Sequence, residues 1–189
     1  LTGAQKRVLS EIMEDLEKEK SMNRLIQGDV GSGKTIVALT ALLTAVDNKM
    51  QSALMVPTEI LAEQHYLNIR PYCESLGIEL SLITSALKGK DRQKLYENIR
   101  TGKTQIVVGT HSLIQKDIQF KKLGLAVVDE QHRFGVLQRD AIGKKGDHPH
   151  LLIMTATPIP RSLALTLYGD MDVSLLDEFP PGREKITTE

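Results

Sequence analysis

Eight residues, Gly28-Asp29-Val30-Gly31-Ser32-Gly33-Lys34-Thr35, match the pattern G-x-x-x-x-G-K-[ST] of a phosphate-binding loop. A short apolar run at 23–27 precedes the loop and predicts a strand, and the apolar stretch at 35–46 predicts a buried helix. Glycines permit positive φ angles and a close backbone approach, so that the loop N–H groups point at a phosphate. A glycine-rich turn without a ligand is the alternative, and the strand–loop–helix context favours the nucleotide site.

Two residues of the loop have specific expected roles. Lys34 is expected to reach the β and γ phosphates, and the hydroxyl of Thr35 is expected to ligate Mg²⁺. For Asp29 and Ser32, a role as loop formers only is the alternative. The other residues expected to line the nucleotide site are Gly28, Asp29, Val30, Gly31, Ser32 and Gly33.

An acidic pair supplies the second part of the predicted site. Asp129 and Glu130 directly follow the apolar run 125–128, at the carboxyl end of a predicted strand. Asp129 is expected to hold Mg²⁺ through water, and Glu130 is expected to act as the base that activates water. A surface pair at a strand exit is the alternative. Ligands of open α/β sheets bind outside the carboxyl ends of the strands. Gly28, Asp129 and Thr155 are therefore expected to lie along one edge of the sheet, the edge formed by these carboxyl ends.

Predicted strands and helices alternate along the whole chain. Continuous apolar strands between helices indicate a parallel sheet that is covered on both faces. The predicted fold class is therefore α/β, with three layers (α/β/α) and a mostly parallel central sheet. Strands are expected at 23–27, 52–56, 80–84, 105–108, 123–128, 151–154 and 173–176. Helices are expected at 5–20, 35–46, 60–76, 91–100, 136–142 and 161–168.

Length and composition restrict the class of protein. The chain has 189 residues, enough for one well-packed domain. Its composition, with 41% hydrophobic and 25% charged residues, excludes a disordered tail or a disulfide scaffold. The apolar runs are far below the roughly 18 residues that span a bilayer. The single cysteine, Cys73, is expected to be a buried thiol in a cytoplasmic protein. Because the chain starts without methionine, we expect it to be a piece of a longer protein.

Five short motifs, taken together and in this order, resemble the first RecA-like lobe of the superfamily-two helicases. They are motif I (Gly28 to Thr35), motif Ia (Pro57-Thr58-Glu59), motif Ib (Gly109-Thr110-His111), motif II (Asp129-Glu130-Gln131-His132) and motif III (Thr155-Ala156-Thr157). The resemblance implies a RecA-like P-loop NTPase lobe over residues 1–178. It implies a linker at 179–189 toward a missing second lobe, with ATP and Mg²⁺ as cofactors and DNA as the partner.

Longer strings resemble one branch of this superfamily. GDVGSGKT (28–35), DEQHRFG (129–135) and TATPIPRSLAL (155–165) are similar to bacterial helicases that remodel branched DNA, such as stalled forks and Holliday junctions. The transcription-repair coupling factors (Mfd) are the alternative, but they have Glu at the position of Gln131, and the string PPGR at 180–183 favours the first group. A P-loop metabolic kinase and a non-catalytic module are the alternatives from other classes.

The resemblance assigns roles to further residues. His132, Thr155 and Thr157 would link the nucleotide site to movement on DNA, and Gln131 would approach the γ-phosphate. Four residues would face the DNA backbone: Pro57, Thr58, Thr110 and His111. Gln5 resembles an adenine-binding glutamine, while Thr2-x-x-Gln5 is also the pattern of a helix capping box.

The net charge of zero conceals a segregation of charge. Residues 88–122 carry nine Lys/Arg and three Asp/Glu and include the motif Ib residues, whereas residues 11–20 carry five acids and two bases. A DNA backbone would fit the basic stretch, and a solvated face is the alternative. We expect this chain alone to be monomeric, to bind DNA weakly and to hydrolyse ATP slowly, because the second lobe completes the active site.

Overall fold

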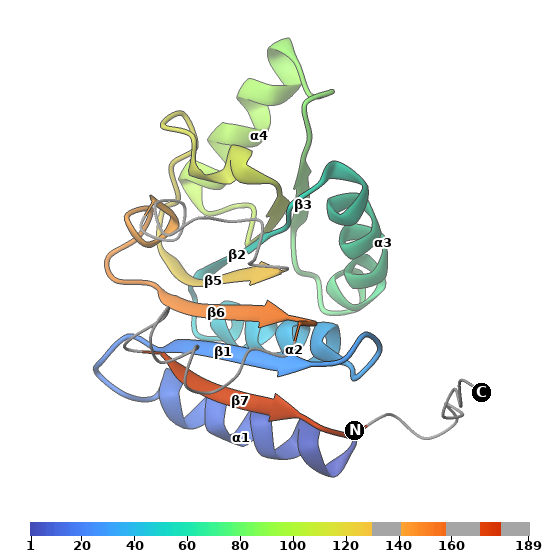
Figure 1. Cartoon of the computed structure of the whole chain (residues 1–189). Coiled ribbons are helices and arrows are strands. Elements are labelled where there is room, and N and C mark those ends of the chain that lie inside the picture. Colours follow the sequence, from blue (N-terminus) through green and yellow to red (C-terminus); the bar gives the residue numbers. More distant parts are fainter. Residues whose placement is uncertain (130–140, 158–170, 179–189) are drawn as a thin grey trace, which may run out of the picture.

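A computed structural model describes residues 1–129, 141–157 and 171–178. A seven-stranded sheet, with strand order β3-β4-β2-β5-β6-β1-β7, forms the centre of the domain (Figure 1). All six neighbouring pairs run parallel, which confirms the predicted α/β class with a parallel sheet. The strands are β1 (Asn23–Gly28), β2 (Gln51–Met55), β3 (Leu80–Ile83), β4 (Ile106–Gly109), β5 (Leu123–Asp129), β6 (His150–Thr155) and β7 (Asp172–Leu176).

Helices cover both faces of this sheet. They are α1 (Gly3–Leu16), α2 (Lys34–Asp47), α3 (Glu59–Ser75), α4 (Gly89–Thr101) and the short 3-10 helix η1 (His111–Ile114). Buried residues of α1, α2 and α3 form one apolar cluster with one face of the sheet. Residues of α4 and η1 form a second cluster on the other face, together with Ile118 and Ile142. The structure therefore has the predicted three layers.

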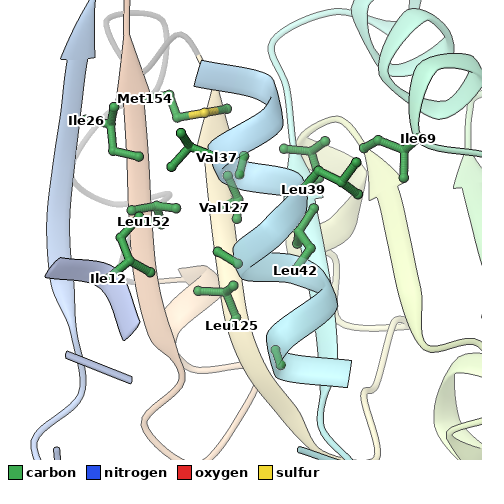
Figure 2. Packing of buried hydrophobic residues seen from close by; sticks show 14 of the residues in the cluster. Ile12, Ile26, Val37, Leu39, Leu42, Ile69, Leu125, Val127, Leu152 and Met154 are labelled. Carbon is green, nitrogen blue, oxygen red and sulfur yellow. The ribbon is translucent and has the colours of Figure 1, made fainter. Parts of the chain in front are cut away.

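Successive side chains of β5 point in turn to the two faces of the sheet, and both faces are buried, which explains the continuous apolar run in its sequence. In β5, Leu125 and Val127 belong to the first cluster, whereas Ala126 and Val128 belong to the second. Figure 2 shows Val127 packing close to Val37 of α2, beneath which Leu42 continues the same cluster. Because both faces of β5 are buried, successive residues of this strand can all be apolar.

Helix α3 forms where it was predicted, but it does not pack through most of its large apolar residues. The apolar residues Ile60, Leu67, Tyr72 and Leu76 helped to predict the helix, but all four are exposed in the structure. The buried face is instead formed by Ala62, His65, Ile69 and Cys73. These four positions follow one another at intervals of three and four residues, but only Ile69 among them is large and apolar, so they give a weaker hydrophobic pattern than the exposed face.

Other features agree with the prediction or lie outside it. Cys73 is fully buried, as expected, and this burial raises the pKa of its thiol. The predicted helix at 161–168 and most of the one at 136–142 fall outside the described residues. Helix η1 was not predicted. In the described part of the chain, no helix has both the length and the apolar character needed to cross a membrane.

Candidate nucleotide site

The phosphate-binding pattern forms a tight loop between β1 and α2. Gly31 and Gly33 have φ angles of 84° and 88°, a left-handed conformation that favours glycine. The N–H of Ser32 donates to the carbonyl of Asp29 at 3.1 Å and closes the turn. A Cβ atom on Gly33 would lie 2.1 Å from Nε2 of Gln5, so this position has no room for a side chain. Backbone conformation and close packing therefore both require glycine here.

The polar side chains of the loop are arranged at its centre and its end. Nζ of Lys34 donates to the carbonyl oxygens of Gly28 (2.6 Å) and Asp29 (2.9 Å), so the ammonium group lies over the loop. Thr35 is exposed in the first turn of α2. Oγ of Ser32 is buried and has no hydrogen-bond partner within the described residues. A cation, an exposed hydroxyl and an unsatisfied buried hydroxyl suit a phosphate and its metal ion.

Asp129 lies at the same edge of the sheet as the loop. Its Cα pairs with that of Met154 in β6, and the next residue of β6, Thr155, pairs with Gln27 of β1. One strand, β6, separates β5 from β1, so these two strands lie about 10 Å apart at the usual strand spacing. The expected meeting of Gly28, Asp129 and Thr155 at one edge is therefore confirmed.

A histidine that was not predicted contacts this carboxylate. Nε2 of His65 lies 2.8 Å from Oδ2 of Asp129, and both side chains are largely buried. His65 lies on the buried face of α3, 64 residues earlier in the chain. The sequence does contain one signal, because His65 lies four residues from both Leu61 and Ile69 and so on the same face of the predicted helix. This spacing does not identify Asp129 as the partner of His65.

The hydroxyl groups predicted as motif III contact each other. Oγ1 of Thr155 lies 2.9 Å from Oγ1 of Thr157 and accepts a hydrogen bond from the backbone N–H of Thr157 at 3.2 Å. Thr155 is buried at the end of β6, whereas Thr157 is exposed. The pair thus lies between the loop after β1 and Asp129 at the end of β5.

The residues predicted to face DNA follow two neighbouring strands. Pro57 and Thr58 come after β2, and Thr110 and His111 come after β4, which pairs with β2. Oγ1 of Thr58 accepts from the N–H of Leu61 at 3.3 Å, so Thr58 caps α3. Thr110 is buried, while His111 is exposed.

A cleft of about 270 Å³ connects these two segments. Polar and charged side chains line most of it, including Glu59, Ser85, Arg92, Thr110, His111, Ser112 and Gln115. The carboxylate of Glu59 accepts from the N–H and the hydroxyl of Ser85, which fixes one wall. The structure therefore brings together motifs Ia and Ib, and strands β5 and β6 separate motif Ia from the phosphate loop.

Gln5 forms the capping box that was one of its two predicted roles. Its Oε1 accepts from the N–H of Thr2 at 2.9 Å, and Oγ1 of Thr2 accepts from the N–H of Gln5 at 3.1 Å. Nε2 of Gln5 also donates to the carbonyl of Ser32 at 2.9 Å. The side chain thus contacts the phosphate loop itself, and the predicted contact with adenine stays a prediction.

Three predicted site residues, Glu130, Gln131 and His132, lie outside the described residues, as does the predicted linker at 179–189. Within the described ranges, no three His, Cys, Asp or Glu side chains form a metal-binding group.

Comparison with known proteins gives high similarity over the whole chain. The chain is 57% identical over 191 residues to the ATP-dependent DNA helicase RecG of Haemophilus influenzae, with 99% of this chain and 28% of that protein covered. It is 59% identical to RecG of Pasteurella multocida, with the same shares covered. The chain thus spans little more than a quarter of the length of these curated relatives.

A solved structure agrees with this similarity. The structure of RecG bound to a three-way DNA junction matches with a TM-score of 0.83 and 48% identity, over 98% of this chain and 25% of that one. The family model of the DEAD/DEAH box helicases matches residues 2–166, which includes the phosphate loop, Asp129 and Thr155. The chain therefore belongs to the DEAD/DEAH box helicase family.

Proposed function

We propose that this chain is the first motor lobe of an ATP-dependent DNA helicase of the RecG type, which remodels branched DNA in recombination and repair. The observation that carries the proposal is the arrangement of the phosphate loop, Thr155 and Asp129 along one edge of the sheet. Similarity to RecG over 99% of this chain favours this function over that of a transcription-repair coupling factor or a metabolic kinase.

The proposed nucleotide is ATP with Mg²⁺. Lys34 would contact the β and γ phosphates, and the Thr35 hydroxyl with the Asp129 carboxylate would hold the metal ion. Bound Mg²⁺ would supply positive charge that stabilises the phosphates during transfer to water. Glu130 is the proposed base, Gln131 the proposed γ-phosphate contact and His132 the proposed link to DNA-dependent movement, all by resemblance to the family.

The proposed DNA contacts lie at the other half of the same edge. The hydroxyl of Thr58, the ring of His111 and the lining of the cleft beside Thr110 would contact the phosphate backbone, which carries no sequence information. Thr155 and Thr157 would couple the two halves. Grip on branched DNA and the second lobe would come from other parts of a longer cytoplasmic protein.

The test uses the full-length helicase with three DNA states: no DNA, linear duplex and a model fork. ATP hydrolysis should rise most with the fork, and Lys34→Ala should abolish it, because this change removes the positive charge that is proposed to contact the β and γ phosphates. Lys20→Ala is the matched control, since Lys20 is exposed before β1 at the opposite edge. A rate of ATP hydrolysis that does not change with DNA, or that is retained in Lys34→Ala, contradicts the proposal.

A further inference from the structure

A buried contact joins α3 to the carboxylate at the end of β5. Nε2 of His65 lies 2.8 Å from Oδ2 of Asp129, and the two side chains are only 8% and 13% exposed. Burial of two polar side chains is favourable only when they are hydrogen-bonded to each other or to the backbone. The contact therefore fixes the position of both groups in the folded domain.

The chemistry of the two groups sets the direction of the bond. An ionised carboxylate only accepts, so the imidazole donates from Nε2. Nδ1 of His65 is buried without a hydrogen-bond partner among the described residues. The tautomer with its proton on Nε2 fits this environment, because it leaves no buried N–H unpaired. The bond occupies one of the two carboxylate oxygens and leaves the other for a water or a metal ion.

We propose that His65 is a positioning residue, which orients the Asp129 carboxylate toward the magnesium ion of the bound nucleotide. The inference rests on the proposed function, because it needs Asp129 to serve the nucleotide's metal ion. Groups that hydrogen-bond to metal ligands fix ligand orientation, and their loss costs about 10- to 100-fold in metal affinity. His65 is the only described side chain that hydrogen-bonds to Asp129.

The position of His65 on α3 gives the contact a further consequence. Thr58 caps this helix, and His65 follows two turns later, about 10 Å along the helix axis. The helix that begins at the proposed DNA contacts therefore holds the proposed metal ligand. A change in the position of α3 changes the position of the group that orients Asp129.

The experiment measures Mg²⁺ affinity of the purified chain with a fluorescent ADP analogue, by titrating Mg²⁺ into the metal-free complex. Three variants are compared: His65→Leu, His65→Asn and His65→Gln. Gln places an amide nitrogen four bonds from Cα, as far as Nε2 of histidine, whereas Asn is one bond shorter and Leu has no donor. His150→Asn is the matched control, because it replaces a half-buried histidine at the opposite edge of the sheet.

Mg²⁺ affinity should fall at least about tenfold in His65→Leu and His65→Asn and stay within about threefold of wild type in His65→Gln. Affinity for the nucleotide without metal should be unchanged in all variants, which a general loss of structure would not allow. Wild-type Mg²⁺ affinity in a folded Leu or Asn variant overturns the inference, as does an equal loss in Gln. If Leu does not fold, the contrast between Asn and Gln decides.

Asp129→Asn separates failure of this inference from failure of the proposed function. If Asp129→Asn loses Mg²⁺ affinity and the His65 variants do not, only the positioning role is wrong. If Asp129→Asn itself retains full Mg²⁺ affinity, Asp129 does not hold the metal ion, and the proposed nucleotide site is wrong.

Discussion

Nε2 of Gln5 donates to the carbonyl oxygen of Ser32 at 2.9 Å, and this bond attaches the first turn of α1 to the phosphate loop 27 residues later. The same amide accepts from the N–H of Thr2. Gln5 is 3% exposed, so both contacts are shielded from water. The conformation of the loop therefore depends in part on a hydrogen bond from α1, a helix that is distant from the loop in sequence.

Replacement of Gln5 by Ala should weaken nucleotide binding without changing base preference. The change removes the loop contact and half of the capping box, at a cost of about 1 kcal/mol in the free energy of unfolding. Because both polar atoms of the amide are engaged by the protein, affinities for ADP and GDP should fall by the same factor. Titration of fluorescent analogues of both nucleotides measures this.

Thr2→Ala is the control for the Gln5 variant. It removes the hydroxyl that caps α1 but keeps the bond from Gln5 to Ser32. We expect a similar loss of stability with nucleotide affinity unchanged. A selective loss of ADP binding in Gln5→Ala would show instead that Gln5 contacts the adenine base.

Gly33→Ala should abolish nucleotide binding and destabilise the domain. Alanine is strained at a φ of 88°, and its Cβ would lie 2.1 Å from Nε2 of Gln5. The combined cost should exceed that of backbone strain alone, about 1–2 kcal/mol, since the displaced Gln5 adds to it. Gly77→Ala is the matched control, because Gly77 has a φ of 66° but no atom within 4 Å of an added Cβ.

Chemical denaturation and ADP titration distinguish the two glycine variants. Gly77→Ala should lose about 1–2 kcal/mol from backbone strain alone and bind ADP normally. Equal effects of the two variants on ADP binding would show that packing of the loop against Gln5 is unimportant.

The phosphate loop and the edge of the sheet could be predicted because their information is local. Gly28 to Thr35 is a continuous pattern, and parallel strands bring Asp129 and Thr155 to the same edge regardless of the distance in sequence. The sheet was recognisable for a similar reason, because strands that are buried on both faces are continuous apolar runs.

The contact between His65 and Asp129 could not be predicted in this way. It depends on which face of α3 packs on the sheet, and the strongest apolar residues of that helix, such as Ile60 and Leu67, lie on the exposed face. A single buried histidine has no periodicity of its own. Helix periodicity therefore located the helix correctly but not the residue that it brings to the site.

Arg24→Met should destabilise the domain strongly, because Arg24 is the centre of a buried polar cluster. Its guanidinium donates to Asp15 at 2.7 Å, to Ser174 at 2.7 Å and to Glu11 at 3.1 Å, which joins α1, β1 and β7. Its loss leaves the buried carboxylate of Asp15 with Lys18 as its only charged partner among the described residues, so the free energy of unfolding should fall by up to about 3–5 kcal/mol. Urea denaturation measures this cost.

Acid should weaken the same cluster. Burial, the largest influence, raises the pKa of Asp15, but hydrogen bonds and charge from Lys18 and Arg24 together hold this pKa below its ordinary value of 3.8. A lowered carboxyl pKa stabilises the fold above pH 3.8, and this stability is lost as the pH falls toward the folded-state pKa. Arg24→Met should therefore show less acid sensitivity than wild type below about pH 4.

Arg100→Met is the control for Arg24. Arg100 pairs with Glu97 at 2.7 Å, but both side chains are more than half exposed. Water and salt screen such surface pairs, so this variant should unfold nearly as wild type does. A comparable loss from both arginine variants would show that burial does not decide the effect.

His150 should make the domain less stable in mildly acidic solution. Burial lowers the pKa of His150, and the charge of Asp15 only partly opposes this. Its Nδ1 accepts from the N–H of Met22 at 2.9 Å, an interaction that needs the unprotonated nitrogen. In the unfolded chain His150 binds a proton near its ordinary pKa of 6.5, whereas in the folded chain it does so only at lower pH. Stability is thus complete above pH 6.5 and falls as the pH drops toward the folded-state pKa.

His150→Asn isolates this contribution from those of the other histidines. The Oδ1 atom of Asn lies three bonds from Cα, as Nδ1 of histidine does, and can accept from Met22 without titrating. The free energy of unfolding should therefore fall less between about pH 7.5 and 5.5 in the variant than in wild type. Urea denaturation at both pH values measures the difference, and identical pH dependence in the two proteins would show that His150 is equally easy to protonate folded and unfolded.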